Sequence, residues 1–156
     1  MPDLYRQQIL DRARNPRHWG LLSSRDIRAD ETNVTCGDEV TIDLKFENRN
    51  SKIESSGSRN NFQLPASHFL ISQAGFEGSG CIISQASTDM LLDMLTGKTI
   101  IDIMGMPDQD VLDFFDNQLT ISRQSCALLP LLALRKGIAE KSASISHGSK
   151  KNKEKS

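Results

Sequence analysis

The sequence predicts an α+β fold, because strand patterns occupy the first half of the chain and helical patterns dominate the second half. Apolar and polar residues alternate from Val40 to Glu47, which is typical of a strand with one buried face. A second strand-like stretch follows near Phe69 to Phe76. Apolar residues then recur at helical spacing, most strongly from Leu128 to Ile138.

Length and charge limit the kind of protein that this chain can be. Its 156 residues are the size of one domain. Lysines crowd the last stretch, so the rest is mildly acidic, which argues against a nucleic-acid-binding face. The amino terminus is polar and no stretch approaches the length of a membrane span, so we expect a cytoplasmic protein without a membrane segment.

The elements before the first cysteine are a helix and a loop. A short helical pattern begins at Leu4 and is ended by Pro16, since the residue before proline is disfavoured in a helix. Trp19 is expected to clamp this helix onto the core. The polar composition from Ser23 to Thr35 predicts a loop that leads to Cys36.

The helices of the second half have recognisable ends. Ser84 is a plausible N-cap of a helix that runs to Gly97, whose flexibility suits the left-handed position after a helix. A shorter helix is predicted from Asp108 to Phe115. The terminal helix is expected to begin at or near Cys126, because Pro130 in a helix interior would clash with the carbonyl of that residue.

Three cysteines, Cys36, Cys81 and Cys126, each lie at a predicted junction between elements. Together with Asp38 they supply the four ligands that tetrahedral zinc or an iron–sulfur cluster requires. Two of the cysteines precede predicted helices, whose amino termini favour the thiolate form. The spacing lacks short CxxC pairs, so a shared site and three small core side chains are both compatible with the cysteines alone.

Several motifs occur together in one order along the chain. They are Arg14-Asn15-Pro16, Cys36-Gly37-Asp38, the segment from Phe76 through Gly80-Cys81 to Ser87, Gly97-Lys98, and Arg123-Gln124-Ser125-Cys126-Ala127-Leu128. In these motifs the chain resembles, from about Leu4 to Ile138, the U-type iron–sulfur cluster assembly proteins, which include IscU, SufU and the NifU amino-terminal domain.

The resemblance implies a small antiparallel sheet covered on one face by helices, with the cysteine loops converging at one end. It implies that Cys36, Asp38, Cys81 and Cys126 are the ligands, and that Cys126 accepts persulfide sulfur from a cysteine desulfurase. Residues 1–141 would form this domain, with an enlarged loop at about 48–68. Residues 142–156, rich in serine and lysine, are predicted to be a disordered tail.

Departures from the IscU pattern bear on the subtype. Ser125 stands where IscU-like members have histidine, and Leu119 to Arg123 replaces the Leu-Pro-Pro-Val-Lys segment, which argues against binding to the specialised Hsp70 chaperone. Arg123 resembles the SufU pattern and is a candidate for electrostatic support of the site. The short interval between Cys81 and Cys126 is instead similar to that of IscU.

Three hypotheses therefore follow. The first is a scaffold or carrier, rather than a turnover enzyme, that assembles a [2Fe-2S] cluster or holds iron and passes clusters to apo-proteins. The second is a SufU-like sulfurtransferase partner of the desulfurase, with zinc on the same four residues. A purely structural zinc module ranks last, because the predicted core is large enough to fold without metal.

Overall fold

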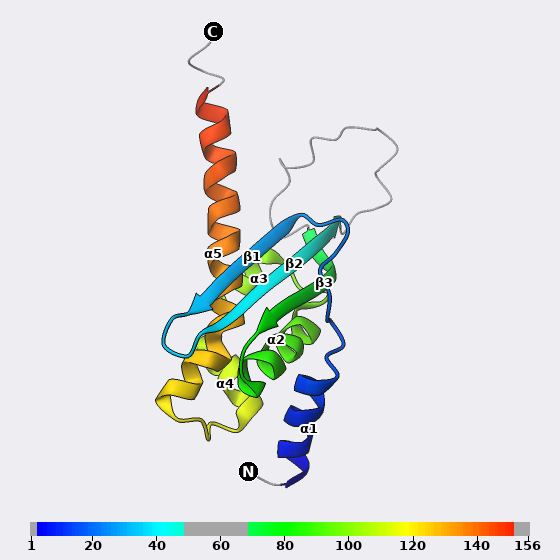
Figure 1. Cartoon of the computed structure of the whole chain (residues 1–156). Coiled ribbons are helices and arrows are strands. Elements are labelled where there is room, and N and C mark those ends of the chain that lie inside the picture. The colour runs from blue at the N-terminus through cyan, green and yellow to red at the C-terminus, as the bar shows by residue number, and fades with distance from the viewer. Residues whose placement is uncertain (1–2, 49–68, 152–156) are drawn as a thin grey trace.

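The computed structural model describes residues 3–48 and 69–151 and shows a three-stranded antiparallel sheet with helices packed behind it (Figure 1). The strands follow one another in the order β1-β2-β3. The elements are α1 (Asp3–Arg14), β1 (Ile27–Asn33), β2 (Asp38–Asn48), β3 (Phe69–Ser79), α2 (Ile82–Leu95), α3 (Ile100–Met104), α4 (Asp108–Leu112), the 3-10 helix η4 (Asp113–Phe115) and α5 (Ile121–Lys151). The predicted α+β class and antiparallel sheet are confirmed.

The central strand β2 behaves as its sequence predicts. Val40, Ile42 and Leu44 point to one face and are buried, with exposed fractions of 4% or less. The long helix α5 packs against β1 and β2 on that face, while α2 packs against β3 and α5. The larger of the two hydrophobic clusters among the described residues therefore lies between the sheet and these two helices, and a smaller one joins α1, α2, η4 and α5 through Ile9, Ala86, Phe115 and Ala127.

Asp43 is an exception to the alternation along β2, because it is fully buried although it belongs to the polar face. Its carboxylate accepts hydrogen bonds from Arg28 Nε (2.7 Å), Arg28 Nη2 (2.8 Å) and the Leu22 amide (3.0 Å). Burial acts to raise the pKa of Asp43, but these hydrogen bonds outweigh it and hold the pKa below its ordinary value. The carboxylate thus ties the chain before β1 to the outer face of the sheet.

The prediction of a loop from Ser23 to Thr35 is wrong, because β1 lies within it. This strand buries mainly Ile27 and Ala29, which face α5, and its other side chains are polar. Two small or medium apolar residues give a weak period-2 signal in the sequence. Pairing with β2 over the whole of β1 stabilises the strand and supplies what the local pattern lacks.

The terminal helix is longer than predicted at both ends. It begins at Ile121, so Cys126 is its sixth residue and Pro130 lies in its interior. A proline there removes one backbone hydrogen bond, and burial of the helix against the sheet and α2 compensates for that loss. At the other end α5 continues to Lys151, whereas a disordered tail was predicted from residue 142.

The amino-terminal helix α1 is attached to α2 by charged side chains. Arg12 bonds Asp89 (2.6 Å) and Asp93, and the His18 amide donates to Asp89 (2.9 Å). Asp89 is fully buried in α2. These bonds fix the position of α1 beside the end of the sheet where the cysteines lie.

Trp19 does not clamp α1 onto the core as expected. It is 52% exposed, and its ring meets Phe76 edge-on, with 5.4 Å between the ring centroids. Hydrogen bonds of 2.8 Å from the Gly20 amide to Phe76 and of 2.9 Å from the Phe76 amide to His18 align this segment with the edge of β3. Trp19 therefore covers part of that edge.

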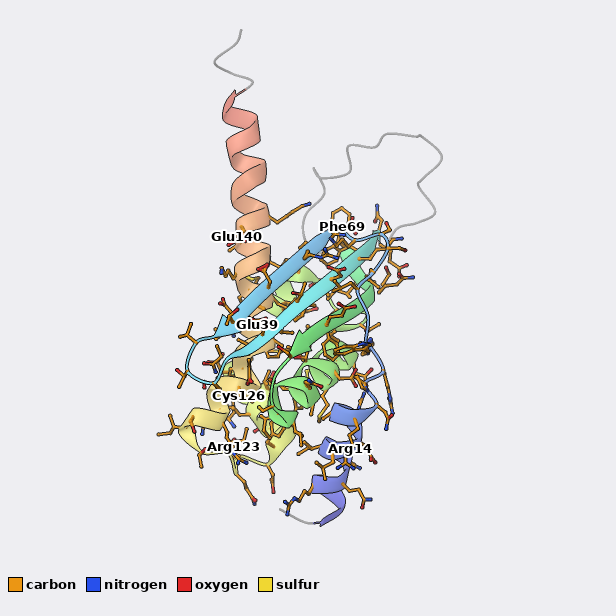
Figure 2. All side chains as sticks on the ribbon, viewed as in Figure 1. Arg14, Glu39, Phe69, Arg123, Cys126 and Glu140 are labelled. Carbon is orange, nitrogen blue, oxygen red and sulfur yellow. The ribbon has the colours of Figure 1, made fainter. Side chains whose placement is uncertain are left out.

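The predicted loop at about 48–68 lies almost wholly outside the described residues. β2 ends at Asn48, which pairs with Phe69 at the start of β3. Figure 2 shows Phe69 at the end of the sheet opposite Cys126. Among the residues that the structure describes, no helix combines the length and apolar character needed to cross a membrane.

Candidate metal centre

Residues from three separate parts of the chain meet at one end of the sheet. Cys36 lies in the turn between β1 and β2, and Asp38 is the first residue of β2. Cys81 lies between β3 and α2, and Cys126 belongs to the second turn of α5. The convergence of the cysteine segments at one end, expected from the sequence, is therefore present in the fold.

The side chains of these residues are close enough to share one ligand. The candidate ligand atoms of Cys36, Asp38 and Cys126 all lie within 4.8 Å of one another. The Sγ atoms of Cys36 and Cys126 are 3.1 Å apart. Cys81 lies outside this group of three, but its Sγ is 3.4 Å from Asp38 Oδ2, so the carboxylate links all three sulfurs.

The separations among Cys36, Asp38 and Cys126 are compatible with the binding of a single ion. Zinc–sulfur bonds of about 2.3 Å place tetrahedral sulfur ligands about 3.8 Å apart. The sulfurs of Cys36 and Cys126, 3.1 Å apart, would separate slightly around one ion, and the Cys81 sulfur, which lies outside the group of three, would move toward it. A [2Fe-2S] cluster divides its ligands between two irons, so its two ligand pairs must be farther apart than the ligands of one ion. Three thiolates and one carboxylate are a suitable donor set for zinc or iron.

The turn that carries Cys36 depends on a glycine and an asparagine. Gly37 has φ of +75°, in the left-handed region that favours glycine. Its amide donates to the carbonyl of Asn33 (2.7 Å), and the Thr35 amide donates to Asn33 Oδ1 (3.1 Å). The turn therefore brings the Sγ atom of Cys36, an exposed residue, to 3.1 Å from Cys126 Sγ of α5.

Asp38 is held in place from the side of Cys81. Its side chain is buried, with an exposed fraction of 3% for the residue, and the Cys81 amide donates to Oδ1 (3.1 Å). A methyl group on Gly80 would lie 2.8 Å from both Asp38 Oδ1 and Ser84 Oγ. The absence of a side chain at Gly80 therefore leaves room for the carboxylate.

The two predictions that placed cysteines at helix amino termini have different outcomes. Cys81 is the N-cap of α2, so the predicted cap Ser84 is wrong; the Ser84 hydroxyl donates to the Cys81 carbonyl (3.1 Å). Cys126 lies inside α5 and is buried. Burial first, and then hydrogen bonding with Cys36 and Asp38, raise the pKa of Cys126 above its ordinary value. A bound cation would oppose this shift.

The group lies on a cleft of about 1310 Å³. Its wall includes Arg6 from α1 and Arg123 from α5, together with Cys36, Asp38, Cys81 and Cys126. Arg123 is exposed and lies one helical turn before Cys126 (Figure 2). The predicted site residues are thus all on this cleft.

Two residues near the group were not predicted from the sequence. Arg6 has an ordinary charged position on an amphipathic helix, and nothing in its neighbourhood indicates a cleft. Asn33 could have been found, since Asn-x-Thr-Cys-Gly is rich in residues that shape turns. Because the polar composition predicts a loop where β1 lies, the sequence does not connect that signal to a strand end.

Three thiols and one carboxylate at one end of an antiparallel sheet define the class of site, a candidate metal site rich in sulfur. The chain matches, over residues 4–146, the family described as the NifU-like N terminal domain, and it belongs to that family. It is therefore a member of the iron–sulfur cluster assembly proteins that include IscU and SufU.

Named relatives differ in what they are said to do. The chain is 30% identical over 154 residues to the zinc-dependent sulfurtransferase SufU of Bacillus subtilis, covering 88% of this chain and 90% of that protein. It is 28% identical over 106 residues to the iron–sulfur cluster assembly scaffold protein IscU of Thermotoga maritima, covering 68% of this chain and 61% of that protein.

Solved structures support the fold. The SufU protein of Fervidobacterium islandicum aligns with a TM-score of 0.61 at 24% identity, covering 84% of this chain and 93% of its own. A NifU-like amino-terminal structure from Brucella abortus also gives 0.61, at 20% identity, covering 90% and 96%. These likenesses establish a shared architecture.

Proposed function

We propose that this protein accepts sulfur from a cysteine desulfurase during iron–sulfur cluster assembly, at a metal site formed by Cys36, Asp38, Cys81 and Cys126. The observation that carries the proposal is the meeting of three sulfurs and one carboxylate on an open cleft. Structural metal sites have no need of such a cleft, whereas a site that receives sulfur from another protein must be open to it.

Cys126 is the proposed acceptor. Its thiolate attacks the outer sulfur of the persulfide on the desulfurase cysteine, a bond forms between the two sulfurs, and the original sulfur–sulfur bond breaks. The desulfurase cysteine leaves as a thiolate, so no external oxidant or reductant is required. Cys126 belongs to a long helix packed in the core, which gives the acceptor a fixed position.

Arg123 is the proposed source of electrostatic support. Its side chain lines the cleft and lies one turn before Cys126 on the same helix. A guanidinium there favours thiolate over thiol and attracts an incoming persulfide. Its exposure keeps the cation free to reorient as the partner binds.

The identity of the bound metal distinguishes two forms of this function. In the first form the four residues hold the cluster itself, as a scaffold that passes a [2Fe-2S] cluster to apo-proteins. In the second form they hold zinc, which keeps coordinated thiols deprotonated, and the protein relays sulfur. The compact group of Cys36, Asp38 and Cys126, and the SufU relative that aligns along most of the chain, favour the second form.

Mapping of transferred sulfur tests the acceptor. The purified protein is mixed without oxygen with the desulfurase from its own source and with cysteine, and each cysteine peptide is examined by mass spectrometry. We expect one added sulfur on Cys126, and none after Cys126→Ser. Sulfur on Cys36 or Cys81, with Cys126 unmodified, would show that the acceptor is misassigned.

The metal and sulfide content of protein purified without oxygen after expression with that desulfurase separates the two forms. Zinc without acid-labile sulfide, together with faster desulfurase turnover, supports the relay. Iron with sulfide, lost on Cys81→Ala, supports the scaffold. For the scaffold, Asp38→Ala should retain the cluster longer, since an exchangeable carboxylate ligand aids release.

A further inference from the structure

Asn33, the last residue of β1, connects two of the proposed ligands. Its side chain reaches the turn that carries Cys36 with one end and the helix that carries Cys126 with the other. We infer that Asn33 is a positioning residue that sets the separation of Cys36 and Cys126. The inference rests on the proposed function for the roles of those two cysteines.

The carbonyl end of the side chain shapes the turn. Asn33 Oδ1 accepts a hydrogen bond from the Thr35 amide (3.1 Å), while the backbone carbonyl of Asn33 accepts from Gly37 (2.7 Å). An asparagine that bonds its own backbone two residues on is a common way to fix a tight turn. Both bonds act on the segment that contains Cys36.

The amide end of the side chain reaches α5. Asn33 Nδ2 lies 3.2 Å from Ser125 Oγ and 4.0 Å from Cys126 Sγ. The Ser125 hydroxyl donates its own proton to the Ser122 carbonyl (2.6 Å), so its oxygen is left to accept from Asn33. Donors and acceptors are therefore consistent across the whole chain of bonds.

The asparagine side chain accepts a hydrogen bond from the Thr35 amide and donates one to Ser125 at the same time. Aspartate retains the acceptor for Thr35 but has no proton to donate to Ser125 or to the Cys126 sulfur. Alanine provides neither the acceptor for the Thr35 amide nor the donor to Ser125. Hydrogen bonds to ligand atoms orient them and tune the metal, and their removal commonly weakens metal binding by about 10- to 100-fold.

The 3.1 Å separation of the two sulfurs gives a test that needs no metal. Hydrogen peroxide converts the Cys36 and Cys126 thiols into one disulfide, as two protons and two electrons reduce the peroxide to two waters. The rate of this closure in metal-free protein, divided by the rate at which the same thiols react with iodoacetamide, reports how often the sulfurs meet.

The test compares wild type with Asn33→Ala and Asn33→Asp. Thr32→Ala is the matched control, because Thr32 is the preceding residue of β1, is exposed, and points to the other face of the sheet. Circular dichroism and thermal unfolding confirm that each variant is folded. We expect both Asn33 variants to slow closure by about tenfold or more, and the control to match wild type.

Cobalt(II) titration gives the second readout. Asn33→Ala should weaken cobalt binding by about tenfold and shift the sulfur-to-cobalt charge-transfer band to lower energy, because a sulfur without its N–H partner is more electron-rich. Wild-type closure and wild-type cobalt binding in Asn33→Ala would overturn the inference. Wild-type closure in Asn33→Asp would overturn the role of the amide nitrogen. Neither readout uses a desulfurase, so failure of the sulfur-transfer proposal would be seen separately.

Discussion

Gly80 offers a direct test of how the carboxylate of Asp38 is placed. In Gly80→Ala the new methyl would lie 2.8 Å from Asp38 Oδ1 and 2.9 Å from Asp38 Cγ. Comfortable non-bonded contacts begin at about 3.5 Å, so the carboxylate must retreat by roughly half an ångström or more. Metal ligands tolerate little displacement, and we expect zinc affinity to fall by about 10- to 100-fold.

The assay is competition for zinc against a chromophoric chelator, with thermal unfolding of the metal-free protein measured alongside. Gly97→Ala is the matched control, because its φ of +86° strains the same substitution while nothing lies within 4 Å of the added methyl. The control should lose stability by about 1 kcal/mol and keep its zinc affinity. Unchanged zinc affinity in a folded Gly80→Ala protein would refute the placement of Asp38 as a ligand.

Three further predictions concern the scaffold around the site. Asp89→Asn should lower the free energy of unfolding by about 2 kcal/mol or more in urea titrations, because it removes the negative charge of a fully buried residue that pairs with Arg12. An unchanged urea midpoint would contradict this. Asp43, whose pKa is held low against burial by Arg28, contributes stability that is present above about pH 4 and lost as pH falls through its folded pKa. Urea titrations between about pH 5 and pH 2 should therefore show a shallower loss for Asp43→Asn than for wild type, and equal slopes would count against this. Gly137→Ala should lower the free energy of unfolding, measured by calorimetry, by about 1–3 kcal/mol, since its methyl would lie 2.6 Å from the Ala29 side chain of β1. Wild-type stability would mean that α5 lies farther from the sheet.

Strong periodic patterns made most of the fold predictable. The alternation from Val40 to Glu47 predicted β2, and Gly97 does adopt the left-handed conformation expected after α2. The helix expected from Asp108 to Phe115 is present as α4 followed by η4. In each case local preference and tertiary packing favour the same structure.

The elements that were missed depend on tertiary contacts. β1 has too few apolar residues to be seen locally, and its pairing with β2 stabilises it. The start of α5 at Ile121 does not follow from the sequence, because Pro130 ordinarily disfavours a helix that begins so far ahead of it. The second error placed Cys126 at the amino terminus of the helix, whereas it is buried within α5.

The proximity of the four candidate ligands was predictable, and their supporting contacts were not. Cys36, Asp38, Cys81 and Cys126 form motifs that can be read along the chain. The bonds from Asn33 join residues about ninety positions apart, as the separation of 92 between Asn33 and Ser125 shows. Such contacts exist only once the sheet and α5 have packed together.

The central claim is that three sulfurs and one carboxylate oxygen bind a single ion. X-ray absorption at the zinc edge of zinc-loaded protein tests it most directly. We expect three sulfur neighbours at about 2.3 Å and one oxygen neighbour at about 2.0 Å, with the protein-derived oxygen lost in Asp38→Ala. A first shell with two sulfurs or fewer, or with an imidazole nitrogen in place of the carboxylate, would contradict it.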